Sequence, residues 1–138
     1  MVRRLLAGLV VVGGVYAAVV PAAVASPLPV PGDRLTVVVS GTGGGDGTFQ
    51  LDCGPVGGDH PRAEQACERL GELALGGGDP FAPVPPHVMC TMQYGGPGAA
   101  HVTGIWQGRS VDASFNRGNG CEISRWNTLV PVLPDARA

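Results

Sequence analysis

The first regular segments of the chain are a β-branched run and a run in which apolar and polar residues alternate, and both are typical of β-strands. Residues 34–40 form a β-branched run of strand length, and residues 48–53 alternate between apolar and polar side chains. The glycine-rich residues 41–47 lie between these segments and predict the turn of a hairpin. A phosphate-binding loop is the alternative, but no lysine follows the glycines and the next pattern is a strand instead of a helix.

A second pair of β-compatible segments predicts another hairpin in the C-terminal half. Residues 99–106 and 109–115 are compatible with β-structure and flank Gln107-Gly108, where glycine can supply the positive φ of a tight turn. Residues 128–133 predict a last strand, which Pro131 restricts to a sheet edge or a bulge because proline has no N–H donor. The patterns therefore predict about five strands in total.

Between Pro61 and Leu75 the apolar positions recur every three or four residues, which is the period of an amphipathic helix. These positions are Ala63, Ala66, Cys67, Leu70, Leu73 and Ala74. Asp59 and Pro61 suit the first turn of the helix, and residues 76–78, all glycine, end it. Residues 121–126 are long enough for one or two further helical turns. The expected architecture is α+β, an antiparallel sheet with helix packed on one face.

Residues 1–25 have the three parts of a secretory signal peptide. Two arginines precede an apolar run over residues 5–20, and small residues follow as far as Ala25. A transmembrane helix is the alternative, but glycines and a proline interrupt the apolar stretch and no stop-transfer charges follow it. We therefore expect cleavage between Ala25 and Ser26 and a secreted, extracellular protein.

Cleavage leaves 113 residues, which divide into a flexible Pro-rich arm over residues 26–32 and one domain over residues 33–138. Because the removed segment carries two basic residues, the remaining chain has seven basic and eleven acidic residues, a net charge of −4 with neutral histidine. Nucleic-acid binding relies on clustered basic charge, so this balance argues against a nucleic-acid partner. No membrane association is expected after cleavage.

Four cysteines in an exported chain of this size predict disulfide bonds, since a small core gains stability from covalent links. Of the three possible pairings, the sequential one, Cys53 with Cys67 and Cys90 with Cys121, is favoured. It would join the second strand to the long helix, and the Pro-rich loop to the segment before the last strand. A zinc site is the alternative, but the sequence has no Cys-x-x-Cys pair and its histidines lack a spacing partner. We expect no metal and no cofactor.

Signatures of hydrolytic enzymes are missing from the sequence. No serine lies in a Gly-x-Ser-x-Gly turn, no His-Glu-x-x-His motif occurs, and paired cysteines would leave no free thiolate nucleophile. His60, His87 and His101 lie in different predicted elements. The chain is therefore not expected to be an enzyme. A small exported hydrolase, with a Ser-His-Asp triad assembled across the fold, is the alternative.

Residues 87–98 combine medium-sized apolar side chains with prolines before them and glycines after them. These flanks keep the apolar residues from joining the core as a regular strand, and a disulfide bond at Cys90 would anchor the segment. An exposed, anchored loop of this kind is a candidate binding element. An ordinary surface loop with a buried methionine is the alternative.

Four blocks of residues resemble the Streptomyces subtilisin inhibitor family in their order and approximate spacing. The blocks are Cys53…Ala63…Ala66-Cys67…Leu70, Val88-Met89-Cys90-x-Met92-x-Tyr94, Gly104-Ile105-Trp106-Gln107-Gly108-Arg109 and Asn119-x-Cys121-Glu122. The resemblance implies a five-stranded antiparallel sheet with one long and one short helix on one face, and two disulfides in the sequential pairing. It also implies a homodimer joined through the sheet and inhibition of subtilisin-type serine proteases without catalysis.

By position, the resemblance implies that the bond between Met92 and Gln93 is the reactive bond, offered to the protease as a substrate-like decoy. The loop residues expected to contact the protease beside this bond are Met89, Cys90, Thr91 and Tyr94. A secreted, non-inhibitory binding module of the cell envelope is the alternative function.

The loop departs from the family pattern at three places. Thr91 stands where the family commonly has proline, Gln93 stands where a hydrophobic residue is often found, and Gly95-Gly96 replaces stiffer residues. These departures predict a weaker or more rapidly cleaved inhibitor.

Overall fold

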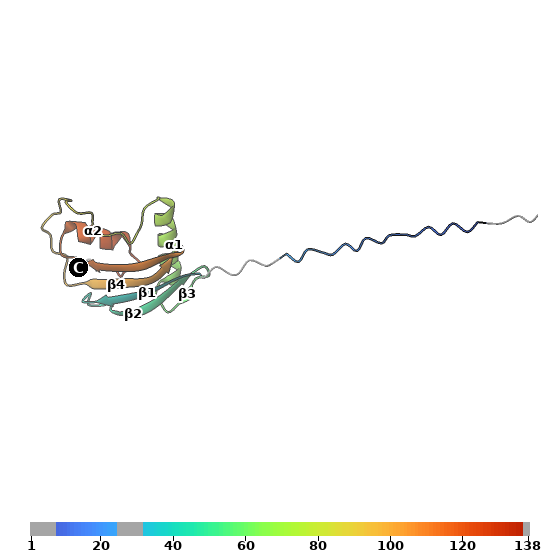
Figure 1. The fold of residues 1–138 in the computed structure, drawn as a ribbon. Helices are drawn as coiled ribbons and strands as arrows, with labels where there is room; N and C mark the ends of the chain where they lie inside the picture. The colour runs from blue at the N-terminus through green and yellow to red at the C-terminus, as the bar shows by residue number, and fades with distance from the viewer. Residues whose placement is uncertain (1–7, 25–31, 137–138) are drawn as a thin grey trace, which may run out of the picture.

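The sheet and helices of this protein come from a computed structural model, which describes residues 8–24 and 32–136. The strands are β1 (Asp33–Ser40), β2 (Gly47–Cys53), β3 (Gly57–Gly58), β4 (Ala99–Trp106) and β5 (Arg109–Asn116), and the helices are α1 (Ala63–Leu75) and α2 (Gly120–Thr128). Both helices lie over the same face of the sheet (Figure 1). The predicted α+β architecture, with a five-stranded antiparallel sheet, is therefore confirmed.

The strand order in the sheet is β3-β2-β1-β4-β5, and all neighbouring strands are antiparallel. Leu35 of β1 lies opposite Leu51 of β2, and Val37 lies opposite Val102 of β4, so the apolar rows of adjacent strands meet on one face. Val38 points to the other face and is 41% exposed. The alternation seen in the sequence thus separates a helix-covered face from an open face.

The core lies between the helices and the covered face of the sheet. Its largest fully buried side chains are Trp126, Phe115, Leu35, Leu51, Leu70, Leu129 and Leu133. Trp126 comes from the last turn of α2, and its indole Nε1 donates a hydrogen bond to the carbonyl oxygen of Pro134 at 2.9 Å. Burial of a side chain this large fixes the position of α2 on the sheet.

The fifth strand is not the one that the sequence predicts. Residues 128–133 complete α2 and continue as turns, and their apolar side chains at Leu129, Val132 and Leu133 are buried in the core from there. The fifth strand is β3, a pair of glycines bonded to the edge of β2. The prediction failed because a short apolar run has the same composition whether it enters the core from a strand or from a turn.

The start of α1 also differs from the expectation. The helix begins at Ala63, and the Asp59 carboxylate lies outside its first turn, where its Oδ1 accepts a hydrogen bond from the Gln50 N–H at 2.6 Å. β3 pairs only with Leu51 and Asp52 of β2, so Asp59 supplies the acceptor for the next N–H of that edge. At the other end, Gly77 has a φ of +77°, as is common just beyond a helix.

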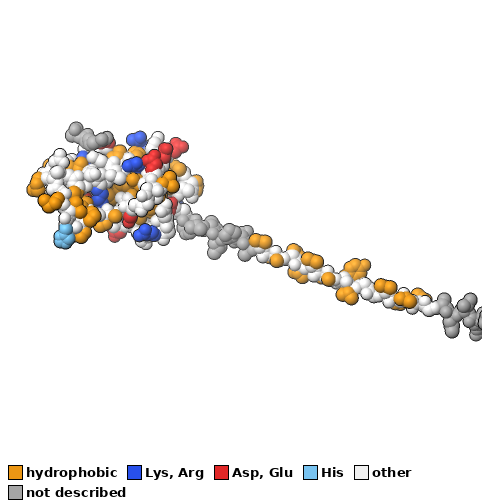
Figure 2. Space-filling view, turned by 90° about the horizontal axis from the view of Figure 1, so that it is seen from above, with side chains coloured by type: hydrophobic (Ala, Val, Ile, Leu, Met, Phe, Trp, Pro, Cys, Tyr) orange, Lys and Arg blue, Asp and Glu red, His pale blue; other side chains and the backbone are white. Residues whose placement is uncertain are grey.

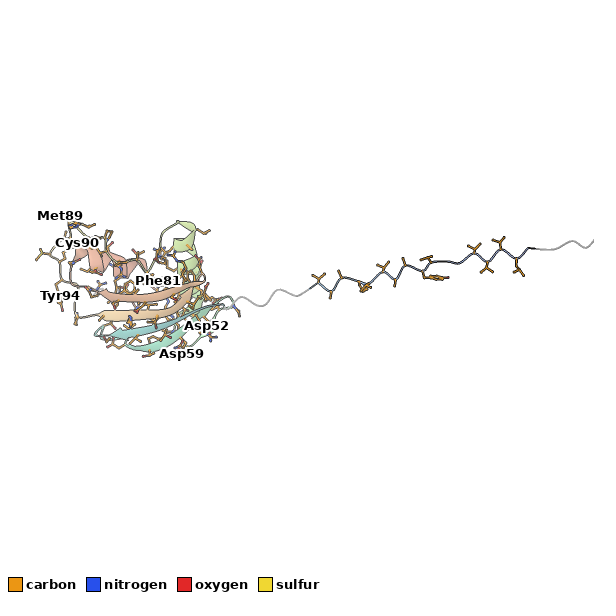
Figure 3. All side chains as sticks on the ribbon, viewed as in Figure 1. Asp52, Asp59, Phe81, Met89, Cys90 and Tyr94 are labelled. Atoms are coloured by element: carbon orange, nitrogen blue, oxygen red, sulfur yellow. A yellow bond between two sulfur atoms is a disulfide. The ribbon has the colours of Figure 1, made fainter. Side chains whose placement is uncertain are left out.

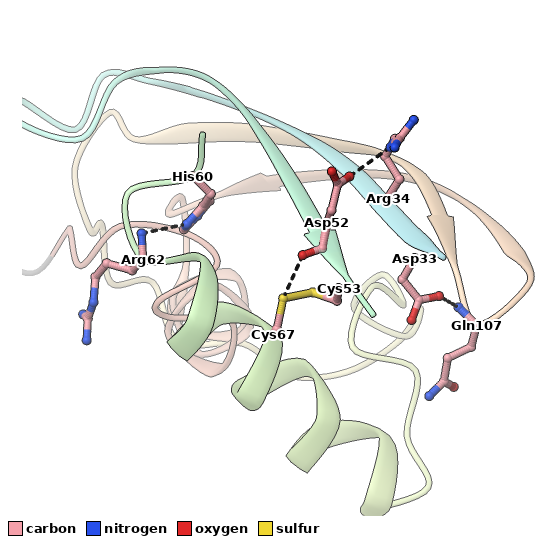
Figure 4. The surroundings of a disulfide bond; sticks show 8 residues. All are labelled: Asp33, Arg34, Asp52, Cys53, His60, Arg62, Cys67 and Gln107. Carbon is pink, nitrogen blue, oxygen red and sulfur yellow. Dashed lines mark hydrogen bonds and ion pairs between the residues drawn. A yellow bond between two sulfur atoms is a disulfide. The ribbon is translucent and has the colours of Figure 1, made fainter. Parts of the chain in front are cut away.

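Two disulfides connect the elements in the sequential pairing. Cys53 at the end of β2 is joined to Cys67 of α1, with Cα atoms 5.6 Å apart (Figure 4). Cys90 is joined to Cys121 in the first turn of α2, with Cα atoms 5.3 Å apart. Within the described ranges, no group of three or more histidine, cysteine or acidic side chains is arranged to hold a metal ion.

The glycine-rich turn between β1 and β2 is closed by its own acidic residue. The Asp46 carboxylate accepts hydrogen bonds from the Thr42 hydroxyl at 2.6 Å, from the Thr42 N–H and from the Gly41 N–H. These donors, the Thr42 hydroxyl first among them, hold the pKa of Asp46 below its ordinary value. The N–H groups of Gly41 and Thr42 are thus engaged within the turn.

Residues 8–24 form no helix or strand and extend away from the domain with their apolar side chains exposed (Figure 2). Leu9 and Val15, for example, are 94% and 95% exposed. In the part of the chain that the structure describes, no helix has the length and apolar character needed to span a membrane. The predicted cleavage point between Ala25 and Ser26 lies outside the described residues, as does the Pro-rich arm up to residue 31.

Candidate functional site

Residues 88–96, the 88–96 loop, form an irregular segment between α1 and β4 at the opposite end of the domain from β3 (Figures 1 and 3). Met89 is 95% exposed, Met92 is 96% exposed and Tyr94 is 72% exposed. Exposed apolar side chains that gather on one segment, unlike single scattered ones, are typical of a surface that binds a partner. The alternative of an ordinary loop with a buried methionine is therefore wrong for both loop methionines.

The segment before Met92 is anchored to the first turn of α2. The disulfide from Cys90 to Cys121 is a covalent anchor two residues before Met92. In addition, the Gly120 N–H donates a hydrogen bond to the Thr91 carbonyl oxygen at 3.0 Å. The backbone on this side of the Met92–Gln93 bond is thus fixed at two adjacent residues.

The segment after Met92 is anchored by Arg117, which lies between β5 and α2. The Gly95 N–H donates to the Arg117 carbonyl oxygen at 2.7 Å, and the Arg117 Nε donates to the Gly95 carbonyl oxygen at 2.9 Å. Both polar backbone groups of Gly95 are therefore engaged by one residue. The Met92–Gln93 bond lies between this anchor and the one formed by α2.

Arg117 is only 3% exposed, which is unusual for a charged side chain. Its Nη1 donates to the Asn127 Oδ1 at 2.9 Å, and its guanidinium carbon lies 5.7 Å from the centre of the Trp126 ring. Sequence reasoning missed this residue, because an arginine in the glycine- and asparagine-rich run 116–120 has the composition of a solvent-exposed loop. No pattern in the sequence could have indicated its burial.

Thr91 and Gln93 make a side-chain contact across Met92. The Thr91 hydroxyl donates a hydrogen bond to the Gln93 Oε1 at 2.9 Å, so the residues on either side of Met92 are linked. The pair lies against Gly120, where an added Cβ would overlap the Thr91 hydroxyl and come within 3.2 Å of the Gln93 Oε1. Two of the departures from the family pattern therefore form one joint contact, which a side chain at position 120 would displace.

The third departure is also in close contact with the rest of the domain. A Cβ on Gly95 would lie 2.8 Å from the Ile123 Cγ1 and 3.1 Å from the Arg117 Cβ, so only glycine fits there without a shift. Gly96 has a φ of +97°, which other residues rarely adopt. Glycine at these positions thus lets the chain approach α2 and turn toward β4. The inhibitory strength expected from the departures stays a prediction.

A hollow of about 630 Å³ lies beside the 88–96 loop and α2, lined in part by Val88, Thr91, Gln93 and Ser124. The loop is therefore not packed against the helix along its whole length. Its shape depends on the disulfide, on the few hydrogen bonds at its two anchors and on the close approach of Gly95 to α2.

His60 and His101 do not form a catalytic triad with the serines in the described part of the chain. The buried His60 contacts the Val132 carbonyl oxygen through Nε2 and accepts the Arg62 N–H at Nδ1. On the open face of the sheet, the His101 Nε2 lies 2.6 Å from the Asp112 Oδ1. Neither histidine is hydrogen-bonded to a serine hydroxyl, and neither is part of the 88–96 loop.

The sequence model of a family described as subtilisin inhibitor-like matches residues 34–119, which is more than half of the chain and includes the whole 88–96 loop. The chain is 41% identical over 85 residues to subtilisin inhibitor-like protein 1 of Streptomyces cacaoi, a match that covers 58% of this chain and 73% of that relative.

Another relative is a subtilase-type protease inhibitor of Streptomyces fradiae, 42% identical over 72 residues, which cover 51% of this chain and 49% of the relative. A solved structure with a similar fold is Streptomyces caespitosus sermetstatin in complex with Bacillus licheniformis subtilisin. The match to this structure has a TM-score of 0.40 and 23% sequence identity, and it covers 72% of this chain and 96% of that one. On the extent of the family match and the identity to the Streptomyces cacaoi protein, this chain belongs to the subtilisin inhibitor-like family.

Proposed function

We propose that this protein inhibits subtilisin-type serine proteases by presenting the Met92–Gln93 bond as a substrate-like decoy. The observation that carries the proposal is an apolar side chain, Met92, that is 96% exposed on a loop anchored on both sides of that bond. The relatives' names, a subtilisin inhibitor-like protein and a subtilase-type protease inhibitor, support the same target class.

The mechanism follows from how a serine protease binds a substrate. The enzyme takes an extended segment, places one side chain in its specificity pocket and holds the scissile carbonyl in an oxyanion hole. Met92 is unbranched and apolar, so it suits a broad hydrophobic pocket. Ordering a flexible segment costs about 1–2 kcal/mol per residue, and a loop held in its bound shape avoids much of that cost.

Inhibition of this kind requires no catalytic group on the inhibitor, and we propose that the protein is not an enzyme. We also propose that residues 1–25 are removed on export and that residues 33–138 act outside the cell. The exposed apolar side chains of residues 8–24, which pack on nothing in the domain, support this division. Extracellular action fits the two disulfides, which persist in oxidising compartments.

We propose further that two copies associate through the open face of the sheet. Val38 and Ile105 are 41% and 38% exposed on that face and lie on the neighbouring strands β1 and β4. Val38→Glu would bury a charge in this apolar interface, which is costly. The variant should therefore sediment as a monomer in sedimentation velocity. Val56→Glu, at a residue that is 50% exposed outside β1 and β4, should leave the dimer intact. Equal sedimentation of the two variants would contradict an interface at this face.

A titration of protease activity tests the function directly. Increasing amounts of the protein should abolish subtilisin activity at a near-stoichiometric ratio. They should have little effect on trypsin, whose pocket carries an aspartate that selects basic side chains. Hydrolysis of the substrate by the protein itself would indicate the exported hydrolase. No effect on either protease would indicate the non-inhibitory binding module.

A further inference from the structure

Cutting the Met92–Gln93 bond leaves two chain ends that are held in different ways. The end at Met92 stays close to α2 because Cys90 is covalently joined to Cys121. The end at Gln93 has no cysteine between it and β4. We infer that Arg117 is the positioning residue that retains the Gln93 end after cleavage, and that it thereby favours the intact over the cut protein. The inference rests on the proposed function.

The contact between Arg117 and Gly95 does not depend on the bond that is cut. Gly95 lies two residues after Gln93, and its N–H and carbonyl oxygen are bonded to Arg117 at 2.7 and 2.9 Å. Cleavage at Met92–Gln93 leaves all of these atoms unchanged. The new amine can then move only as far as the short segment from Gln93 to Gly95 allows.

Burial of the guanidinium makes this contact costly to break. The charge of Arg117 is met by the carbonyl oxygen of Gly95, the side-chain oxygen of Asn127 and the face of Trp126. If Gly95 moved away, a buried charged donor would lose its acceptor, and such groups carry a large desolvation penalty. Gly95 therefore stays bound to Arg117 in the cut protein, and the Gln93 end gains little conformational entropy from the cut.

Retention of the amine affects which reaction follows cleavage. In the acyl-enzyme the Met92 carbonyl carbon is bonded to the oxygen of the protease serine. Attack by the Gln93 amine re-forms the amide bond and returns the proton to the serine oxygen as it leaves. Attack by water instead gives the Met92 carboxylate and the same free serine. An amine kept within reach raises the share of the first reaction.

The ratio of cut to intact protein at equilibrium tests the inference. A catalytic amount of subtilisin is added to intact protein and, separately, to cut protein, until both samples reach the same ratio. Arg117→Met should raise this ratio by about tenfold, which corresponds to about 1.4 kcal/mol.

Arg125→Met is the matched control. Arg125 lies on α2, its Nε donates to the Ala82 carbonyl oxygen at 2.7 Å, and its guanidinium lies 3.9 Å from the Phe115 ring centre. It thus makes the same kinds of contact, but to a segment on the disulfide-linked side of the reactive bond. This variant should keep the ratio within about twofold of the wild-type value. If Arg117→Met also keeps the ratio of cut to intact protein within about twofold of the wild-type value, the inference is overturned.

Hydrogen exchange of the Gly95 amide provides a second readout that needs no variant. In wild-type protein cut at Met92–Gln93, this amide should stay protected, as it is expected to be in the intact protein. If it exchanges at the rate of an unstructured amide after the cut, the inference is wrong although the proposed function stands. If subtilisin cuts a different bond, the reactive-bond assignment fails and the inference fails with it.

Discussion

Met92→Asp should weaken inhibition of subtilisin roughly a thousandfold. The substitution would place an unpaired carboxylate in the apolar pocket that Met92 is proposed to fill, at a cost of about 4 kcal/mol. Because Met92 is 96% exposed, its replacement should leave the melting temperature of the free protein unchanged. The measurement is the inhibition constant for subtilisin, determined beside the thermal unfolding curve.

Met92→Lys should have the opposite effect on a different enzyme. The lysine ammonium would pair with the aspartate in the trypsin pocket, so affinity for trypsin should rise roughly ten- to a hundredfold. Leu75→Asp is the control for a charge on an exposed apolar residue, since Leu75 is 91% exposed at the end of α1. If both Met92 variants behave like the Leu75 control, Met92 does not occupy the specificity pocket.

Removing the second disulfide should convert the protein into a temporary inhibitor. Replacing Cys90 and Cys121 by serine removes roughly 4 kcal/mol of constraint on the unfolded chain and frees the segment before Met92. The remaining anchor there is the hydrogen bond from Gly120 to Thr91, which contributes only about 1 kcal/mol. Subtilisin activity should therefore recover with time as the cut loop leaves the enzyme.

The matched control is the other disulfide. Replacing Cys53 and Cys67 by serine removes roughly 3 kcal/mol of a similar constraint, but this bridge joins β2 to α1 at the other end of the domain. The folded control should still inhibit subtilisin lastingly. Persistent inhibition by both double variants would show that hydrogen bonds and packing alone hold the loop.

Much of the fold is readable from the spacing of apolar residues. The β-branched run over residues 34–40 and the alternation over residues 48–53 predict the β1–β2 hairpin, and the three-to-four spacing before Leu75 predicts α1. These patterns are reliable because one face of each element must be buried. The two disulfides also have the sequential pairing that the sequence analysis favours.

The parts that could not be predicted depend on contacts between distant segments. β3 consists of two glycines, which have no side chains to alternate. The burial of Arg117 results from the approach of Gly95 and Trp126, which are 22 and 9 residues away from it in the sequence. The reactive bond could be assigned only by resemblance, because exposure and anchoring of a loop are properties of the folded chain.

The same limit applies to the departures from the family pattern. From the sequence, Thr91 and Gln93 are two separate replacements, and each suggests a weaker inhibitor. In the folded protein their side chains are hydrogen-bonded to each other against Gly120. Whether a replacement weakens the loop thus depends on the side chains that it contacts, and the sequence alone does not show these contacts.

The most direct test of the reactive bond is to find where subtilisin cuts the wild-type protein. The protein is incubated with a catalytic amount of enzyme, and the products are analysed after reduction by mass spectrometry. We expect a single slow cut that creates a new N-terminus at Gln93 and stops at a plateau with intact protein remaining. Rapid, complete digestion, or a first cut at any other bond, would contradict the account.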